Sequence, residues 1–200
     1  MANTSRGVET QHIILNTALE LFSKNGYDAT SVAEICSMAN VSKGAFYHHF
    51  PSKQDLFLVL MRTWLKDVDG MFQSADAEAE NVPQIFDNMA EISGGLFDAL
   101  EGGFPILLEF WTQANRQPPV WKKAVEPYRQ FLDYFTNLVQ RGINQGEFTQ
   151  DLEPEVAARA IMSIAMGLLL QAIFDSKGAD WQEVTRSSIN LLVKGMRSNS

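Results

Sequence analysis

The chain has 200 residues, of which 46% are hydrophobic and 20% are charged, and its formal net charge is -8. This composition argues against a disordered protein, and a chain of this length buries a core without a metal or disulfides. The one cysteine, Cys36, cannot form an internal disulfide and indicates a reducing compartment. Because the first eleven residues lack the apolar segment of a signal peptide, we expect a soluble cytoplasmic protein.

Charge is distributed unevenly along the chain. Residues 1–66 carry six basic and five acidic side chains, a sum of +1, so the remaining residues carry -9. Phosphate binding relies on lysine and arginine, so the net charge alone would argue against a nucleic-acid partner. Because the N-terminal third is nearly neutral, this part of the chain could still bind nucleic acid.

The chain begins with signals for two helices. Apolar residues spaced four apart over residues 9–25 predict an amphipathic helix, and Gly26 is the kind of residue that ends one. Ser31 and Glu34 then form the sequence pattern of a capping box. We expect a short second helix of about two turns to start there.

A tight turn and two further helices follow. Asn40 tolerates the positive φ that such a turn requires, and Ser42 can cap a third helix over residues 43–50. A second capping pattern at 52–55 predicts a fourth helix over 53–72. Two short helices joined by a tight turn, with longer helices on either side, are typical of a helix-turn-helix unit.

The rest of the chain also has helical periodicity. Residues 74–82 are acidic and poor in apolar residues, so we expect a linker there. Further helices are expected at 83–101, 104–115, 119–145, 154–175 and 180–197. With no convincing alternating run, the fold class is all-α, with an N-terminal three-helix helix-turn-helix domain followed by a helical C-terminal domain.

The third helix has two chemically different faces. Phe46 and Phe50 lie four residues apart and are expected to face the core. The outward face then presents Lys43, Gly44, Tyr47 and His48. Such a face can enter a major groove, where lysine can donate to guanine, and glycine permits close approach of the backbone. Flanking phosphates are expected at the helix starts, near Thr30, Ser31, Ser42 and Lys53.

An ordered set of residues accompanies this arrangement: Leu21-Phe22, Gly26, Tyr27, Thr30, Ile35, Val41-Ser42-Lys43-Gly44, Phe46-Tyr47-His48-His49-Phe50, Lys53 and Leu56. This set resembles the N-terminal domain of the TetR (tetracycline repressor) family of bacterial regulators over residues 14–61, about a quarter of the chain. Cys36 stands where alanine is usual and Asn40 where glycine is usual. Both departures are physically mild.

The resemblance implies a homodimer that binds a palindromic double-stranded DNA operator, and a helical C-terminal domain that binds a small effector. It divides the chain into a DNA-binding domain (1–52, with the helix-turn-helix at 31–50), a connecting helix (53–72) and a ligand-binding and dimerisation domain (73–200). We expect a ligand-responsive regulator, a repressor that its effector releases from DNA.

Residues 94–135 hold nine of the 21 aromatic residues of the chain. These can fill a helical core or line a cavity for a largely apolar or aromatic effector. The expected lining residues are Phe97, Phe104, Leu107, Trp111, Phe131 and Phe135. Glu109 and Asp133 could accept hydrogen bonds from such a ligand, or face water.

The last two predicted helices carry wide apolar stripes. We expect them to form the dimer interface through Ile161, Ala165, Leu168, Leu169, Ala172, Ile189, Leu192 and Val193. The alternative is that both stripes pack only within one chain. The apolar run 160–174 is interrupted by Ser163 and Gln171 and is expected to be too short to span a membrane.

No catalytic constellation, phosphate loop or metal-ligand spacing is evident, so neither an enzyme nor a cofactor is expected. Adjacent helical residues point about 100° apart, so His48 and His49 do not converge on one metal ion. The main alternative function is a helical small-molecule-binding protein whose DNA-binding part is vestigial.

Overall fold

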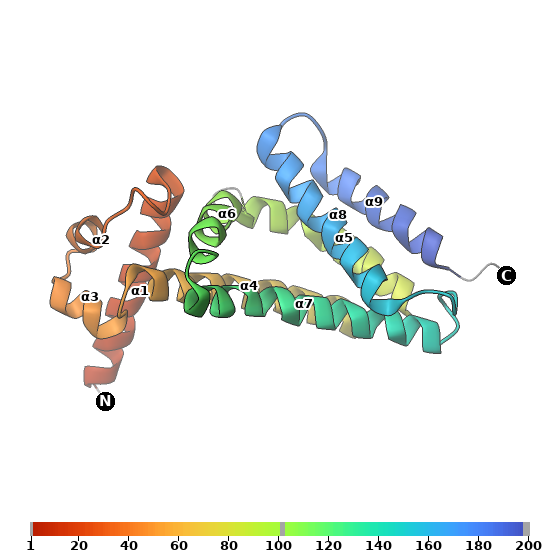
Figure 1. Ribbon diagram of the computed structural model, residues 1–200, viewed down its shortest axis with the longest axis horizontal. Coiled ribbons are helices and arrows are strands. Elements are labelled where there is room, and N and C mark those ends of the chain that lie inside the picture. Colours follow the sequence, from red (N-terminus) through yellow and green to blue (C-terminus); the bar gives the residue numbers. More distant parts are fainter. Residues whose placement is uncertain (1, 101–102, 198–200) are drawn as a thin grey trace. The chain divides into compact units, whose positions relative to one another are not determined.

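The computed structural model describes the backbone of residues 2–100 and 103–197, and the side chains of residues 7–92, 106, 108–112 and 114–197. Over this part of the chain the regular structure is helical, apart from one isolated bridge between Phe148 and Arg197. The predicted all-α class is confirmed. The helices (Figure 1) are α1 (Ala2–Asn25), α2 (Val32–Met38), α3 (Lys43–His49), α4 (Lys53–Ala77), α5 (Val82–Leu100), α6 (Gly103–Ala114), α7 (Pro118–Asn144), α8 (Pro154–Phe174) and α9 (Trp181–Met196).

The predicted signals around the short helices are confirmed. The hydroxyl of Ser31 accepts from the backbone N–H of Glu34, and the Glu34 carboxylate accepts from the backbone N–H of Ser31. The Ser42 hydroxyl caps α3 by accepting from the backbone N–H of Ala45. Asn40 has a φ of 53°, and Gly26 ends α1 with a φ of 87°. The turns that orient α2 and α3 therefore follow from local chemistry.

The expected linker at 74–82 is mostly helical, because α4 continues to Ala77 and α5 already begins at Val82. Ala75 is buried at 4% exposure, and the Asp76 carboxylate pairs with the Arg141 guanidinium at 2.7 Å. Alanine has a high helix propensity, and Ala75 and Asp76 both contact other parts of the chain, so the helix continues through these residues. Polar composition alone therefore misplaced the end of α4.

The chain forms two compact units, neither of which is continuous in sequence. The head unit comprises Met1–Leu65 and Gly102–Val125, and the body unit comprises Lys66–Glu101 and Glu126–Ser200. Helices α4 and α7 contribute to both units. This grouping by compactness differs from the division at residues 52 and 72 expected from the sequence, which concerns function and stays a prediction.

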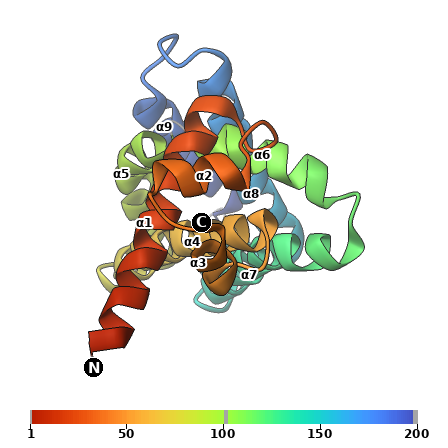
Figure 2. The same ribbon diagram turned by 90° about the vertical axis from the view of Figure 1, so that its left-hand side faces the viewer.

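The head unit contains α1, α2 and α3, which face the viewer in Figure 2, together with α6. Helix α1 packs against α2, α2 against α3, and α1 against α6. Its most fully buried large side chains are Ile14, Phe22, Ile35, Phe46, Phe50, Leu56 and Phe110. Burial of Phe46 and Phe50 anchors α3 and fixes which of its faces points outward.

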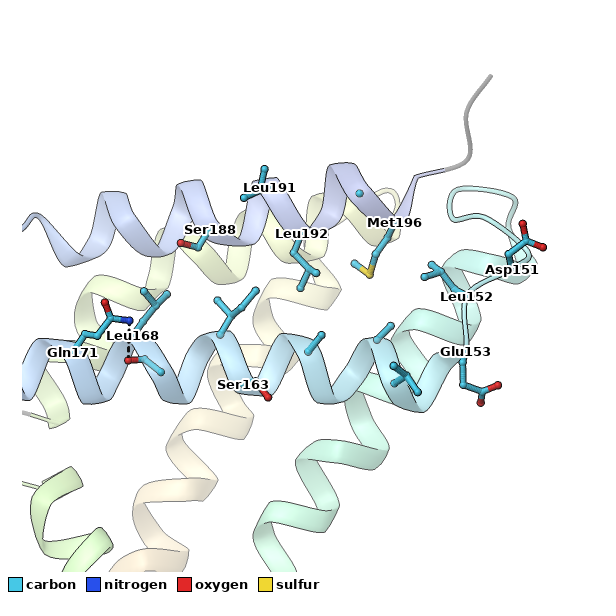
Figure 3. A pocket seen from close by; sticks show the side chains of 16 residues that line it. Asp151, Leu152, Glu153, Ser163, Leu168, Gln171, Ser188, Leu191, Leu192 and Met196 are labelled. Carbon is cyan, nitrogen blue, oxygen red and sulfur yellow. Dashed lines mark hydrogen bonds between the residues drawn. The ribbon is translucent and has the colours of Figure 1, made fainter.

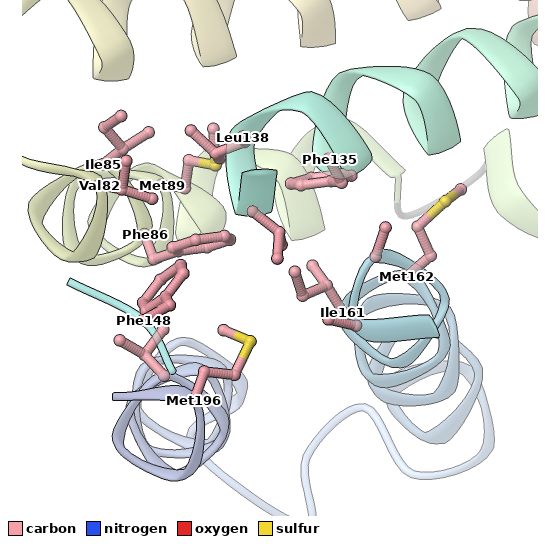
Figure 4. Close-up of a cluster of buried hydrophobic side chains, with 14 of the residues drawn as sticks. Val82, Ile85, Phe86, Met89, Phe135, Leu138, Phe148, Ile161, Met162 and Met196 are labelled. Atoms are coloured by element: carbon pink, nitrogen blue, oxygen red, sulfur yellow. The ribbon is translucent and has the colours of Figure 1, made fainter. Parts of the chain in front are cut away.

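The body unit has a core shared by α5, α7, α8 and α9 (Figure 4). Phe86 of α5 lies beside Phe135 of α7 and Phe148, with ring centroids 6.4 Å apart in both pairs. Met162 and Met196 enter the same cluster from α8 and α9. These contacts hold α8 and α9 against the rest of the unit, so their remaining faces point outward.

Helix α8 has 21 residues, and by length and composition alone it could cross a membrane. The expectation that this segment is too short considered only the run after Ala160, whereas the helix begins at Pro154. Core helices of soluble proteins meet the same criterion, and 28% of the apolar window of α8 is buried within the chain. The exposed part of α8 includes the large apolar residues Val156, Leu170, Ile173 and Phe174.

Candidate functional site

The outward face of α3 has the predicted composition. Lys43, Gly44 and His48 are exposed, and Tyr47 is 52% exposed. On the opposite side Phe46 has no exposed surface, and its ring lies 5.8 Å from that of Phe50. The helix therefore presents one cation, one phenol and one imidazole on a rigidly packed support.

Gly44 has no structural reason to be glycine within the chain. A Cβ atom built there would meet only the Ser42 hydroxyl, at an ordinary contact distance of 3.7 Å, and the backbone is not in the positive-φ region. Glycine in a helix is unfavourable relative to alanine. A close approach by another molecule to this position would account for it.

Two exposed serines flank this face at helix starts. The Ser31 hydroxyl oxygen lies 3.2 Å from the Glu34 backbone nitrogen, and the Ser42 hydroxyl oxygen 3.1 Å from that of Ala45. Both oxygens act as acceptors in these bonds, so each O–H can donate to another group, and that of Ser31 already interacts with the Glu34 carboxylate. The hydrogen bonds from Ser31 lower the pKa of the Glu34 carboxyl. Both serines are thus placed where a phosphate oxygen could accept from them.

Thr30 is placed differently from the expectation that it contacts DNA. Its side chain is completely buried, and its hydroxyl donates to the carbonyl oxygens of Gly26, at 2.8 Å, and Leu21, at 3.3 Å. The hydroxyl therefore ties the end of α1 to the start of α2, and it cannot reach a phosphate in this conformation.

Lys53 also differs from its expected role. Its ammonium group donates to the carbonyl oxygens of Tyr27 at 2.8 Å and Thr30 at 2.9 Å, with a longer contact of 3.4 Å to that of Asp28. It lies 4.3 Å from the centre of the Tyr27 ring, and burial lowers its pKa. Its ammonium group is directed to the protein in this structure, so Lys53 supports the turn, and its contact with DNA stays a prediction.

Glu109 of α6 completes this arrangement and was not identified as part of the DNA-binding unit from the sequence. Its carboxylate accepts from the backbone N–H groups of Tyr27, at 2.9 Å, and Asp28, at 2.6 Å. From the sequence, Glu109 was expected to accept from a ligand or to face water. No local pattern could find this contact, because its partners lie 81 and 82 residues away.

The expected effector residues fall into three groups. The side chains of Phe97, Phe104 and Leu107 lie outside the described residues. Phe135 is 7% exposed and belongs to the body core, and Phe131 packs against that core. Both make edge contacts with the ring of Phe72. An effector-binding role for these two residues stays a prediction.

Trp111 is the remaining effector candidate, and it belongs to the head unit. It lines a cavity of about 640 Å³ with Leu108, Thr112, Asn115, Arg116 and Trp121. Its indole Nε1 is buried and has no hydrogen-bond partner among the described residues. Two indoles beside a guanidinium suit a flat, largely apolar molecule with an acceptor group.

An apolar groove runs between α8 and α9 (Figure 3), with Leu192 and Met196 projecting between the helices. Of the expected interface residues, Leu168 and Leu192 line this groove, and Ala165 is exposed. Ile161 and Val193 instead pack into the chain's own core, because the inward side of the stripe closes the body unit. Val156 and Leu191 also line the groove, at 64% and 75% exposure, and were not among the interface residues expected from the sequence.

Cys36 and the histidines have no special surroundings among the described residues. Cys36 is buried in the head, and burial raises the pKa of its thiol. Within this part of the chain no group of three histidine, cysteine, aspartate or glutamate residues could hold a metal ion. The outward face of α3 and the α8–α9 groove are exposed surfaces that another molecule could cover.

Two known families match parts of the chain. The family described as "Bacterial regulatory proteins, tetR family" matches residues 14–60, and the one described as "BetI-type transcriptional repressor, C-terminal" matches residues 105–193. The first match contains the whole of α2 and α3 and the Lys53 contacts. The second contains Glu109, Trp111 and most of the α8–α9 groove.

Individual proteins are similar over nearly the whole chain. The uncharacterized HTH-type transcriptional regulator YfiR of Bacillus subtilis is 27% identical over 180 residues, covering 88% of this chain and 86% of the relative. The HTH-type transcriptional repressor BepR of Brucella suis is 26% identical, with the same coverage of both chains. The crystal structure of the transcriptional regulator FadR from Bacillus subtilis in complex with stearoyl-CoA has a TM-score of 0.76 at 22% identity, over 93% of this chain and 99% of that one.

Proposed function

Because this chain belongs to the tetR family of bacterial regulatory proteins, it is a DNA-binding transcriptional regulator, and we propose that it is a cytoplasmic homodimeric repressor released from a palindromic operator by a small effector. The observation that carries the proposal is the exposed face of α3. It combines a lysine, a tyrosine and a histidine with a glycine that the chain itself does not require. We assign Lys43, Gly44, Tyr47 and His48 to the major groove, and Ser31 and Ser42 to the flanking phosphates.

The α8–α9 groove supports a second copy of the chain as the permanent partner. Phe174 is 77% exposed and Leu191 is 75% exposed, beside a groove of about 1020 Å³. Exposed apolar area costs about 25 cal/mol per Å² in water, and a two-fold axis lets the same face cover itself. Two copies would also supply the pair of reading helices that a palindromic site needs, about 34–36 Å apart for half-sites one helical turn apart.

The effector is proposed to be a largely apolar or aromatic molecule. The FadR structure contains stearoyl-CoA, a long apolar chain with a polar anionic end. Here the cavity beside Trp111 combines indole surface with Arg116. To test it, a panel beginning with stearoyl-CoA is added to the protein–operator complex. Trp111→Ala should change the response to an active compound and leave DNA binding intact, whereas loss of folding by circular dichroism would assign Trp111 to the core.

The test of the function is selection of bound fragments from the source genome by the purified protein, followed by fluorescence anisotropy at two salt concentrations. We expect a palindromic site, and we expect a Lys43→Ala, Tyr47→Ala double variant to lose it while keeping its helical content. If the folded, dimeric protein recovers no fragment above background, the DNA-binding proposal fails. A helical small-molecule-binding protein with a vestigial reading helix would then be the better account.

A further inference from the structure

The turn between α1 and α2, residues 26–30, is held by two side chains of opposite charge. The Glu109 carboxylate accepts from two successive backbone N–H groups, one to each oxygen. The Lys53 ammonium donates to backbone carbonyls of the same turn. Hydrogen bonds to ionised groups are shorter and stronger than neutral ones. The turn is therefore clamped between an anion on α6 and a cation on α4.

Packing fixes the Glu109 side of this clamp. Phe110, the next residue on α6, stacks on Phe57 with ring centroids 4.2 Å apart and meets Tyr27 edge-on at 5.4 Å. Tyr27 is 3% exposed, so the turn is anchored by its side chain as well as its backbone. A Cβ atom at Gly26 would lie 3.1 Å from a Glu109 carboxylate oxygen. Gly26 thus both adopts the positive φ and leaves room for the carboxylate.

The turn leads directly into the DNA-binding elements. Its last residue, Thr30, precedes Ser31, which caps α2, and α2 packs against α3. A displacement of the turn would therefore move the capping serine and, through α2, the outward face of α3. Glu109 reaches this turn from a helix that lies outside the contiguous helix-turn-helix segment.

We propose that Glu109 is a positioning residue for DNA recognition, which orients the helix-turn-helix by binding the backbone of residues 27 and 28. This inference rests on the proposed function. Part of the operator affinity would then depend on Glu109, although its negative charge prevents it from binding DNA directly.

Because of that negative charge, the two possible roles of Glu109 predict opposite changes in operator affinity when the charge is removed. Glu109→Gln keeps the side-chain shape but leaves one acceptor oxygen, and it turns an NH₂ group toward a backbone N–H. If Glu109 acted only through its charge, its neutralisation would strengthen binding to the polyanion. If Glu109 positions the turn, we expect operator affinity to fall about tenfold, the equivalent of about 1.4 kcal/mol.

The experiment measures operator and non-specific DNA binding by anisotropy across a salt series, for wild type, Glu109→Gln and Glu20→Gln. Glu20 is an exposed glutamate of α1 in the same unit and serves as the charge-matched control. We expect Glu109→Gln to weaken operator binding selectively with an unchanged salt slope, because no phosphate contact is lost. Glu20→Gln should bind as tightly as wild type or slightly more tightly.

Several outcomes would overturn the proposal. Operator binding by Glu109→Gln that equals or exceeds that of Glu20→Gln would do so while leaving the regulator function intact. A wild type that binds no operator would instead contradict the proposed function. If Glu109→Gln does not fold, amide hydrogen exchange of the wild type decides. The Tyr27 and Asp28 amides should exchange far more slowly than free amides, and unprotected amides would exclude the clamp.

Discussion

Helices α3 and α8 both expose surface that a single folded chain does not need, but the chemistry of the two surfaces is opposite. The outward face of α3 is polar and includes Lys43 and His48. That of α8 is apolar, with Val156 64% exposed and Phe174 77% exposed. Both helices are anchored by a buried opposite face, so the exposed residues are available for another molecule and do not result from loose packing.

The difference indicates how long each partner stays. A polar face is well hydrated when it is empty, so its partner can leave at little cost, as release from an operator requires. An open apolar face costs free energy in water and favours a permanent cover. The two surfaces therefore suit a DNA partner that comes and goes and a second copy of the chain that remains.

The largest effect is expected from a charge placed on the apolar face. Leu191→Glu changes a residue that is 75% exposed in the single chain, so folding should be kept. Burying unpaired carboxylates in a dimer costs about 3–5 kcal/mol, and we expect monomers at micromolar concentration by light scattering. Val8→Glu replaces a 51% exposed apolar residue of α1 and should leave the dimer unchanged. A dimeric Leu191→Glu would place the interface elsewhere.

The next largest effect is expected on the polar face. Lys43→Ala should lower operator affinity by about 1–3 kcal/mol and relax the preference for the base pair that Lys43 contacts. Anisotropy with the operator and with its single-base-pair variants measures both. Lys123→Ala removes an exposed lysine of α7 and should change neither quantity. Operator binding that is equal in the two variants would remove Lys43 from the interface.

A smaller effect separates binding from stability at Gly44. Because a Cβ atom meets nothing closer than 3.7 Å within the chain, Gly44→Ala should leave the free energy of unfolding unchanged or raise it by up to about 1 kcal/mol. Operator affinity should nevertheless fall, because the added methyl group would clash with DNA that approaches the α3 backbone closely. Urea unfolding and anisotropy on the same sample test this, and unchanged affinity would contradict close approach of the α3 backbone.

The smallest effect is expected away from both faces, in the interior of the body unit. Burial raises the pKa of Tyr134 to about 12, and its hydroxyl has no hydrogen-bond partner among the described residues. The phenol of Tyr134 ionises near pH 10 in the unfolded chain but only near pH 12 in the folded one. Its ionisation therefore does not affect the free energy of unfolding below pH 10 and lowers it as pH rises from 10 toward 12. Tyr134→Phe should be no less stable than wild type at pH 7.

The same variant should lose less stability between pH 9 and pH 11, roughly the range in which the unfolded phenol ionises. Urea midpoints measured at both pH values provide the comparison. An equally steep alkaline loss in wild type and Tyr134→Phe would show that Tyr134 contributes nothing to it.

Local chemistry explains why the helix-turn-helix could be predicted closely. Ser31 and Glu34 are three residues apart, and the interaction between them forms within one turn of helix. Asn40 adopts its positive φ because of its own side chain and its place in the turn. The assignment of α3 faces required only the spacing of Phe46 and Phe50. Each of these features depends on residues within four positions of one another.

Local patterns did not reveal the contacts of residues whose partners are distant in sequence. Lys53 and Thr30 were expected to contact DNA because their side chains and positions suit phosphate binding. In the structure both side chains donate hydrogen bonds to backbone carbonyl oxygens of the α1–α2 turn. The apolar stripe on α8 was recognised, but not which of its residues close the body core. Ile161 faces inward and Val156 outward, which depends on where α5, α7 and α9 lie.

The sequence by itself determined an all-helical chain, a helix-turn-helix near its start and the side of α3 that faces outward, because caps, turns and helical periodicity act over a few residues. Only the tertiary structure decided that Lys53 faces the protein, that Glu109 holds the turn from a helix 82 residues away, and which edge of α8 stays uncovered. These features are contacts between segments distant in sequence, and such contacts are chosen by the packing of the whole unit and leave no local pattern.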